Sequence, residues 1–119
     1  MILVVRVKLI LAVNPARALP GVQLKLYDRD ELDPDDYLGA AVTDESGEAR
    51  FVFDSEQYTD REDQPSWRLE SMPDLFVVVF DNHGEEVLST REQVVADDLP
   101  DQITVAVPTS LAQQHGLIL

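Results

Sequence analysis

The chain has 119 residues, no cysteine and a formal net charge of −14 at pH 7. The length suits one domain over residues 1–119 with a single hydrophobic core, and the missing cysteine excludes disulfides, thiol nucleophiles and thiolate metal sites. All 23 acidic residues lie after residue 27. Because so negative a surface repels phosphate backbones, nucleic acid is not an expected partner.

The first apolar segment predicts a β-strand. From Leu3 to Val13 every second residue is Leu or Val, whereas Arg6 and Lys8 share the opposite face. In a signal peptide the charges precede the apolar run, and no stretch reaches the roughly 20 apolar residues of a membrane span. We therefore expect a chain without a signal peptide, cytoplasmic by default and not transmembrane.

Short apolar segments then recur between turn residues, a pattern typical of a β-sandwich. Gly47 and Gly84 lie in the turns of two expected hairpins, where a positive φ is required. The expected strands cover residues 2–13, 21–27, 38–43, 48–53, 74–81, 85–90 and 102–107. The pattern predicts an all-β fold: a single antiparallel β-sandwich of seven to eight strands, at most one short helix within 60–72, and a C-terminal tail over 108–119.

The segment 75–80 is apolar on both faces, which predicts a central strand whose second face must also be covered. Three alternatives remain open for what covers this face: the region 54–73 with Trp67, the tail 110–119, or another copy of the chain. The last alternative predicts a homodimer, formed through this face or through an exposed strand edge.

The stretch from Asp28 to Asp36 contains six acidic residues in nine positions. Clustered carboxylates repel one another unless they are solvated or share a cation such as calcium. The candidate calcium ligands are Asp28, Asp30 and Asp36, with Asp81 as a further ligand from another strand end. The alternative is a solvated loop that caps turns and discourages aggregation at a sheet edge.

The spacing of Asp28, Asp30 and Asp36, followed by Tyr-Leu-Gly, resembles the late calcium loop of the calcium-dependent lipid-binding domains of protein kinase C type. That family has a second acidic loop earlier in the chain, but the turn expected at 14–20 has no acid. The resemblance implies a calcium-dependent adaptor that docks on a membrane or protein through the loop 28–38. Peripheral membrane contact is then expected only with calcium.

The strand 21–28, the turn Thr43-Asp-Glu-Ser-Gly47 and the strand beginning Pro73-Asp-Leu-Phe-Val look like the transthyretin-like family over about residues 3–81. The chain lacks the cysteines of that family. The resemblance implies a seven- to eight-stranded sandwich used for binding, often as a dimer or in a larger assembly. Its enzyme branch, the hydroxyisourate hydrolases, ends in Tyr-Arg-Gly-Ser, whereas this chain ends His115-Gly-Leu-Ile-Leu.

The two histidines, His83 in a turn and His115 in the tail, are not accompanied by a recognisable set of nucleophile, base and orienting group. Two interpretations are open for Arg6, Lys8 and Lys25: they form a small outward basic stripe, or they pair with acids across the sheet, which is the preferred interpretation. The sequence therefore predicts a non-enzymatic binding or assembly module whose partner is a protein or a second copy.

Overall fold

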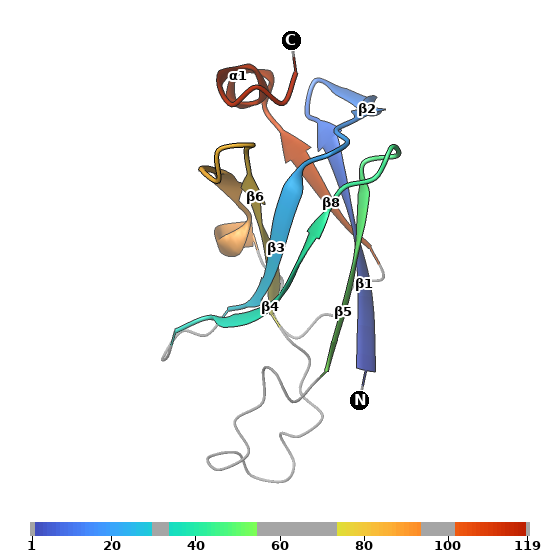
Figure 1. The fold of residues 1–119 in the computed structure, drawn as a ribbon, viewed down its shortest axis with the longest axis vertical. Coiled ribbons are helices and arrows are strands. Elements are labelled where there is room, and N and C mark those ends of the chain that lie inside the picture. Colours follow the sequence, from blue (N-terminus) through green and yellow to red (C-terminus); the bar gives the residue numbers. More distant parts are fainter. Residues whose placement is uncertain (1, 30–33, 55–73, 94–101, 119) are drawn as a thin grey trace, which may run out of the picture.

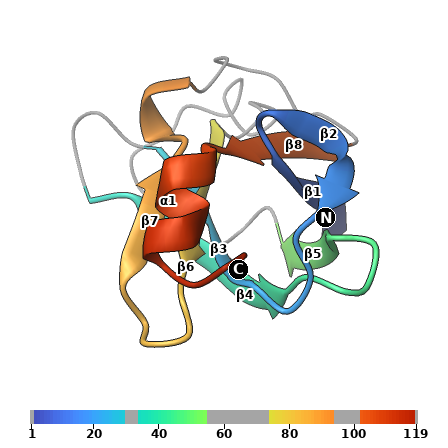
Figure 2. The same cartoon turned by 90° about the horizontal axis from the view of Figure 1, so that it is seen from above.

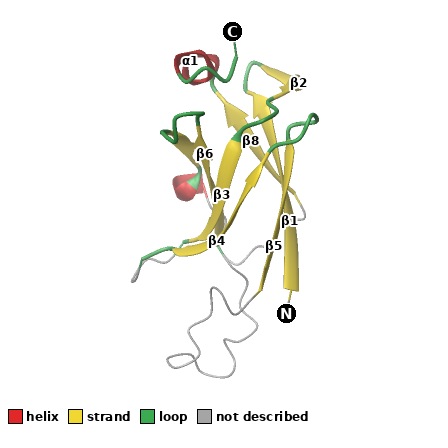
Figure 3. Cartoon of the chain, viewed as in Figure 1, coloured by secondary structure: helices red, strands yellow, loops and turns green. Residues whose placement is uncertain are grey.

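The computed structural model describes residues 2–29, 34–54, 74–93 and 102–118 and shows two β-sheets packed face to face (Figure 1). The strands are β1 (Ile2–Leu11), β2 (Asn14–Ala18), β3 (Gln23–Asp28), β4 (Asp36–Val42), β5 (Glu48–Asp54), β6 (Leu75–Phe80), β7 (Glu86–Ser89) and β8 (Gln102–Val107). The described helices are short: the 3-10 helix η3 (Arg91–Gln93) and α1 (Thr109–Gln114). The predicted all-β sandwich is confirmed (Figure 3). The helix expected within 60–72 lies outside the described residues.

Within the described ranges each sheet has four strands. Sheet A has the order β2-β1-β5, with β8 also paired to β1, and sheet B has the order β4-β3-β6-β7. The β1–β8 pair is parallel, running from Arg6 opposite Gln102 to Leu11 opposite Val107. The other described pairs are antiparallel. The first and last strands along the chain are thus neighbours in one sheet.

The core lies between the two sheets, where the period-two pattern of the sequence places its apolar side chains. In β1 the residues Val5, Val7 and Leu9 are fully buried, and Leu24 of β3 and Val79 of β6 are fully buried as well. All five belong to one hydrophobic cluster. This alternation fixes which face of each strand is left for solvent or for partners.

The prediction of a turn over 14–20 is wrong for its first part, because β2 forms there and the expected strand 2–13 ends at Leu11. Strand β2 folds back on β1, with Ala18 opposite Ile10. Pro15 cannot donate a ladder hydrogen bond, but an edge strand tolerates this. The missing apolar alternation of the segment follows from its position: β2 has no fully buried residue.

Residues 108–119, expected as a tail, contain α1, which lies over one end of the sandwich (Figure 2). Ala112 is fully buried in the core cluster, and Leu111, Leu117 and Ile118 pack against that cluster. The short helix therefore closes the core at this end. Within the part of the chain that the structure describes, no helix is long and apolar enough to span a membrane.

The hydrogen bonds and packing of the turn from Thr43 to Gly47 explain why these two positions hold threonine and glycine. The buried Thr43 hydroxyl accepts a hydrogen bond from the Val22 amide (2.9 Å) and donates one to the Leu19 carbonyl (2.7 Å). Gly47 has φ of 76°, and a Cβ there would lie 2.7 Å from the carbonyl oxygen of Leu9. Thr43 therefore joins two turns, and only glycine fits both the backbone angle and the space at position 47.

The second face of β6 is covered within the chain. Phe76 is 4% exposed and Val78 is 6% exposed, although neither belongs to the core cluster. The Tyr27 ring stacks on Phe76 at 5.2 Å between centroids, and the Arg91 guanidinium lies 6.0 Å from the Phe76 centroid. Among the described residues, Tyr27 of β3 and Arg91 of η3 thus cover Phe76. Because the face is buried, it gives no reason to expect a dimer through 75–80.

Candidate functional site

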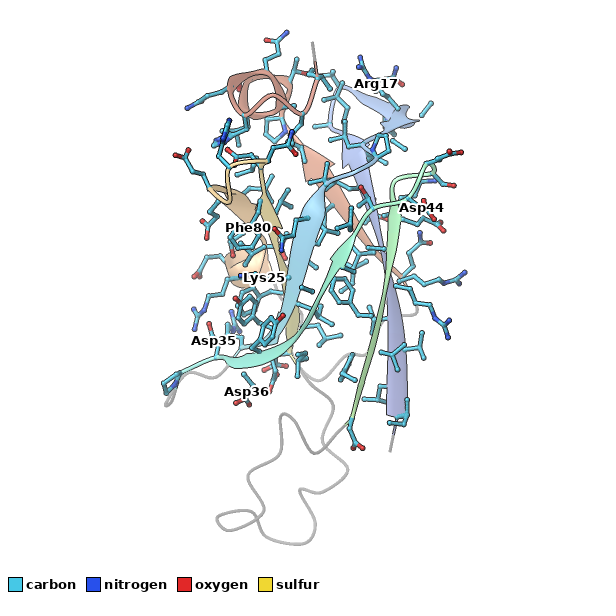
Figure 4. The ribbon with its side chains drawn as sticks, in the orientation of Figure 1. Arg17, Lys25, Asp35, Asp36, Asp44 and Phe80 are labelled. Atoms are coloured by element: carbon cyan, nitrogen blue, oxygen red, sulfur yellow. The ribbon has the colours of Figure 1, made fainter. Side chains whose placement is uncertain are left out.

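The structure brings two of the four predicted calcium ligands together. Asp28 ends β3, Asp36 begins β4, and the two residues lie directly opposite each other in the antiparallel register. Figure 4 shows Asp36 beside Asp35 at this end of sheet B. Asp30 lies outside the described residues.

Asp81 does not belong to this acidic end. In the pairing of β3 with β6, Asp28 lies opposite Leu75, whereas Phe80, the residue before Asp81, lies opposite Gln23 at the far end. A strand of six residues spans about 20 Å. The predicted shared site is therefore wrong for Asp81, which is too far away to bind the same ion as Asp28 and Asp36.

Protein donors already contact two of the carboxylates at the acidic end. Asp35 accepts two hydrogen bonds from Arg91, at 2.8 Å from Nε and 3.1 Å from Nη2, and this pairing raises the pKa of the Arg91 guanidinium. The Asp28 carboxylate accepts the Asp74 amide at 2.7 Å, and Arg29 donates to the Arg91 carbonyl at 3.1 Å. Arginine thus supplies part of the positive charge that a calcium ion would bring under the calcium interpretation of the loop. Arg91 is 56 residues from Asp35, so no local pattern signals the pair.

A second cluster lies at the other end of sheet B, where His115 meets the β6–β7 turn. The Nδ1 atom of His115 lies 2.8 Å from Oδ2 of Asp81, and the two side chains are 12% and 3% exposed. The other oxygen of Asp81 accepts the amides of His83 (2.8 Å) and Glu85 (2.9 Å). The hydrogen bond from His115, followed by that of the Glu85 amide, lowers the pKa of Asp81 to about 2.

Glu85 completes this cluster. One potential ligand atom from each of Asp81, Glu85 and His115 lies within 4.8 Å of the other two. The sequence indicated Asp81 as a candidate metal ligand but gave no signal for His115, because no local pattern shows that the chain end returns to this turn. The donors converge only through the packing of α1.

A third feature is the outer surface of sheet A, here called the sheet A face and defined by Ile2, Val4, Arg6, Arg50 and Val52. Val4 lies directly opposite Val52, and Arg6 lies directly opposite Arg50. The three aliphatic side chains are exposed at 61% (Ile2), 43% (Val4) and 55% (Val52).

The sheet A face differs from the predicted basic stripe. Lys25 lies on sheet B, where its Nζ is 4.8 Å from the Phe80 centroid (Figure 4), so it cannot share a stripe with Arg6 and Lys8. Lys8 does lie opposite an acid, Glu48, in the register. Within the described ranges neither Arg6 nor Arg50 makes an ion pair.

A groove of about 410 Å³ lies between the end strands β7 and β8. Its lining includes Leu88, Thr90, Thr104, Val105, Pro108 and Leu111. None of the lining residues that the structure describes is ionisable.

Fold and surfaces together define this chain as a β-sandwich domain with candidate binding surfaces. No family model and no curated protein matches it. A search of solved structures finds a 9R-lipoxygenase from Cyanothece PCC8801, with a TM-score of 0.53 and 20% sequence identity. The match covers 89% of this chain but 16% of the lipoxygenase, so the chain spans a small part of that protein. The likeness shows a shared fold.

Proposed function

We propose that this chain is a non-enzymatic binding or assembly module that engages a partner protein through the sheet A face. One observation carries the proposal. In a chain of net charge −14, two arginines lie directly opposite each other without an ion pair to a described acid, beside three exposed aliphatic side chains.

This arrangement costs stability in the isolated chain. Like charges directly opposite each other in an antiparallel pair are destabilising, whereas an opposite-charge pair contributes roughly 0.2–1 kcal/mol. Solubility alone is served by acidic residues and does not call for exposed aliphatic side chains. A partner that covers the sheet A face would offset the repulsion between the two arginines and would bury the exposed aliphatic side chains. This supports a role in binding.

The face also indicates the chemistry of its partner. Paired guanidinium groups favour carboxylates, which they bind through two parallel hydrogen bonds. The neighbouring Val4 and Val52 favour an aliphatic surface. A protein segment with acidic and aliphatic side chains satisfies both, whereas the overall negative charge disfavours nucleic acid.

The test uses a photo-crosslinking amino acid at Val52 in the full chain expressed in its host. The control places the same group at Val13, which is 73% exposed outside the sheet A face. We expect a discrete protein adduct from position 52 that disappears with Arg6→Glu. Equal adducts from both positions, or an adduct indifferent to Arg6→Glu, would contradict the proposal.

A transthyretin-like relationship also fits these observations. The part of the chain that the structure describes has eight strands, within the number that the resemblance implies. The Thr43-to-Gly47 motif forms a turn whose hydroxyl and glycine are both required by the packing. We infer a module of this general type, used for binding.

The second candidate function is a calcium-dependent adaptor acting through the loop 28–38. The juxtaposition of Asp28 and Asp36 favours it, and the occupation of Asp35 by Arg91 weakens it. Without Asp81 the site has few ligands, so we expect a dissociation constant of roughly 10⁻⁴–10⁻³ M. Calorimetry with calcium tests this candidate, and vesicles of anionic lipid added with and without calcium test membrane docking. Absence of a heat signal at several millimolar calcium would exclude this calcium-dependent function.

A further inference from the structure

We propose that Asp81, Glu85 and His115 bind a first-row divalent transition metal ion, with zinc as the best-matched ion. Their ligand atoms converge within 4.8 Å from two segments, the β6–β7 turn and the end of α1. The proposal does not depend on the partner proposed for the sheet A face.

The donor set selects the class of metal. Calcium and magnesium take oxygen ligands almost exclusively, whereas imidazole suits zinc and its neighbours. One imidazole and two carboxylates supply three protein ligands, and the fourth tetrahedral position is left for water or for a group from a partner. Two carboxylates and a neutral imidazole also balance the charge of a divalent ion.

Asp81 is oriented before any ion binds. Its Oδ1 atom accepts the amides of His83 and Glu85, so the carboxylate is held with Oδ2 toward His115. Such hydrogen bonds to a ligating carboxylate are typical of the groups that surround bound metals. At 3% exposure the side chain is also shielded from water, unlike an ordinary surface acid.

The present spacing is close to that of two zinc ligands. Oδ2 of Asp81 and Nδ1 of His115 lie 2.8 Å apart, whereas ligands about 2.0–2.1 Å from a tetrahedral zinc ion lie about 3.3 Å apart. An opening of about 0.5 Å therefore admits the ion. For Nδ1 to bind the ion, its proton moves to Nε2, so that the imidazole stays neutral.

The position of the site gives binding a structural effect. Asp81 and Glu85 belong to the β6–β7 turn, while His115 is the C-cap residue of α1, where its backbone amide donates a hydrogen bond to the Leu111 carbonyl (3.0 Å). A bound ion would tie the C-terminal helix to this turn. Because the ion binds the folded chain and the site is absent from the unfolded chain, zinc should raise the unfolding temperature.

The experiment is a titration of the full chain with zinc chloride at neutral pH, followed by calorimetry and thermal unfolding. We expect one zinc ion per chain and a rise in unfolding temperature. His115→Gln should abolish specific binding, and Glu85→Gln should weaken it by about tenfold or more. The matched control is Glu86→Gln, an exposed glutamate in the same hairpin, which should bind zinc like the wild type.

Glu85→Gln separates the metal site from a simple Asp81–His115 ion pair. It retains the Glu85 amide and the ion pair, so the variant should fold normally even if His115→Gln does not. Visible absorption of bound cobalt gives a second measure of the imidazole ligand. The proposal is overturned if zinc causes no shift in the wild type, or if Glu85→Gln and Glu86→Gln bind zinc equally.

Discussion

Replacing Thr43 with valine removes a buried hydroxyl that holds two turns together while almost preserving the shape of the side chain. In the folded chain that hydroxyl satisfies the Val22 amide and the Leu19 carbonyl, and Thr43 is 3% exposed. Each buried polar group left without a partner costs about 1–3 kcal/mol. The added methyl group returns about 0.8 kcal/mol. With two groups left unpaired, we expect a net loss of about 1–5 kcal/mol of unfolding free energy.

Thr43→Ser is the matched control, because it keeps both hydrogen bonds and loses one methyl group, which costs about 1 kcal/mol. Urea unfolding measures the difference between the variants. With a slope of about 2 kcal/mol per molar, the midpoint of Thr43→Val should fall by on the order of 0.5–2.5 M. A valine variant as stable as the serine variant would refute the assigned role of the hydroxyl.

Three further outcomes are expected. Gly47→Ala should lower the unfolding free energy by at least about 1–3 kcal/mol in thermal melts, because its Cβ would lie 2.7 Å from the Leu9 carbonyl oxygen; a neutral effect would contradict that packing. Arg50→Glu replaces the like-charge pair with Arg6 by an opposite-charge pair, so it should raise the unfolding free energy by about 0.2–1 kcal/mol. The same change should abolish the photo-crosslinked protein adduct from position 52. Because the pKa of Asp81 is lowered from 3.8 to about 2 in the folded chain, its stabilising contribution is complete above pH 4 and lost between pH 4 and 2. Urea midpoints measured across that window should fall less steeply in Asp81→Asn than in the wild type.

Most of the fold is predictable because its signals are local. The alternation in β1, β3 and β5 reports which face is buried, and Gly47 and Gly84 mark the hairpins where the chain reverses. Strand β2 is not predictable in this way, because its exposed residues show no alternation of apolar and polar side chains and because it includes Pro15. Its strand structure comes from the edge of β1 that it pairs with.

The candidate sites are less predictable, because each depends on segments that are distant in the sequence. Asp28 and Asp36 flank one loop, so their approach is readable from the chain. Asp81 and His115 are 34 residues apart, and only the fold of α1 over the sandwich end brings them together. The assignment of Asp81 to the acidic end failed for the same reason, since sequence alone does not give the direction in which β6 runs beside β3.

The parallel pairing of β1 with β8 affects the order in which the molecule can form. Strand β1 is the central strand of sheet A, yet one of its edges stays unpaired until the last strand has left the ribosome. Long-range pairings of this kind close a large loop of chain and slow folding. During synthesis the emerging β1 edge can pair with other chains. Sheet B, made from β3, β4, β6 and β7, can assemble earlier, so sheet A should be the late step of folding.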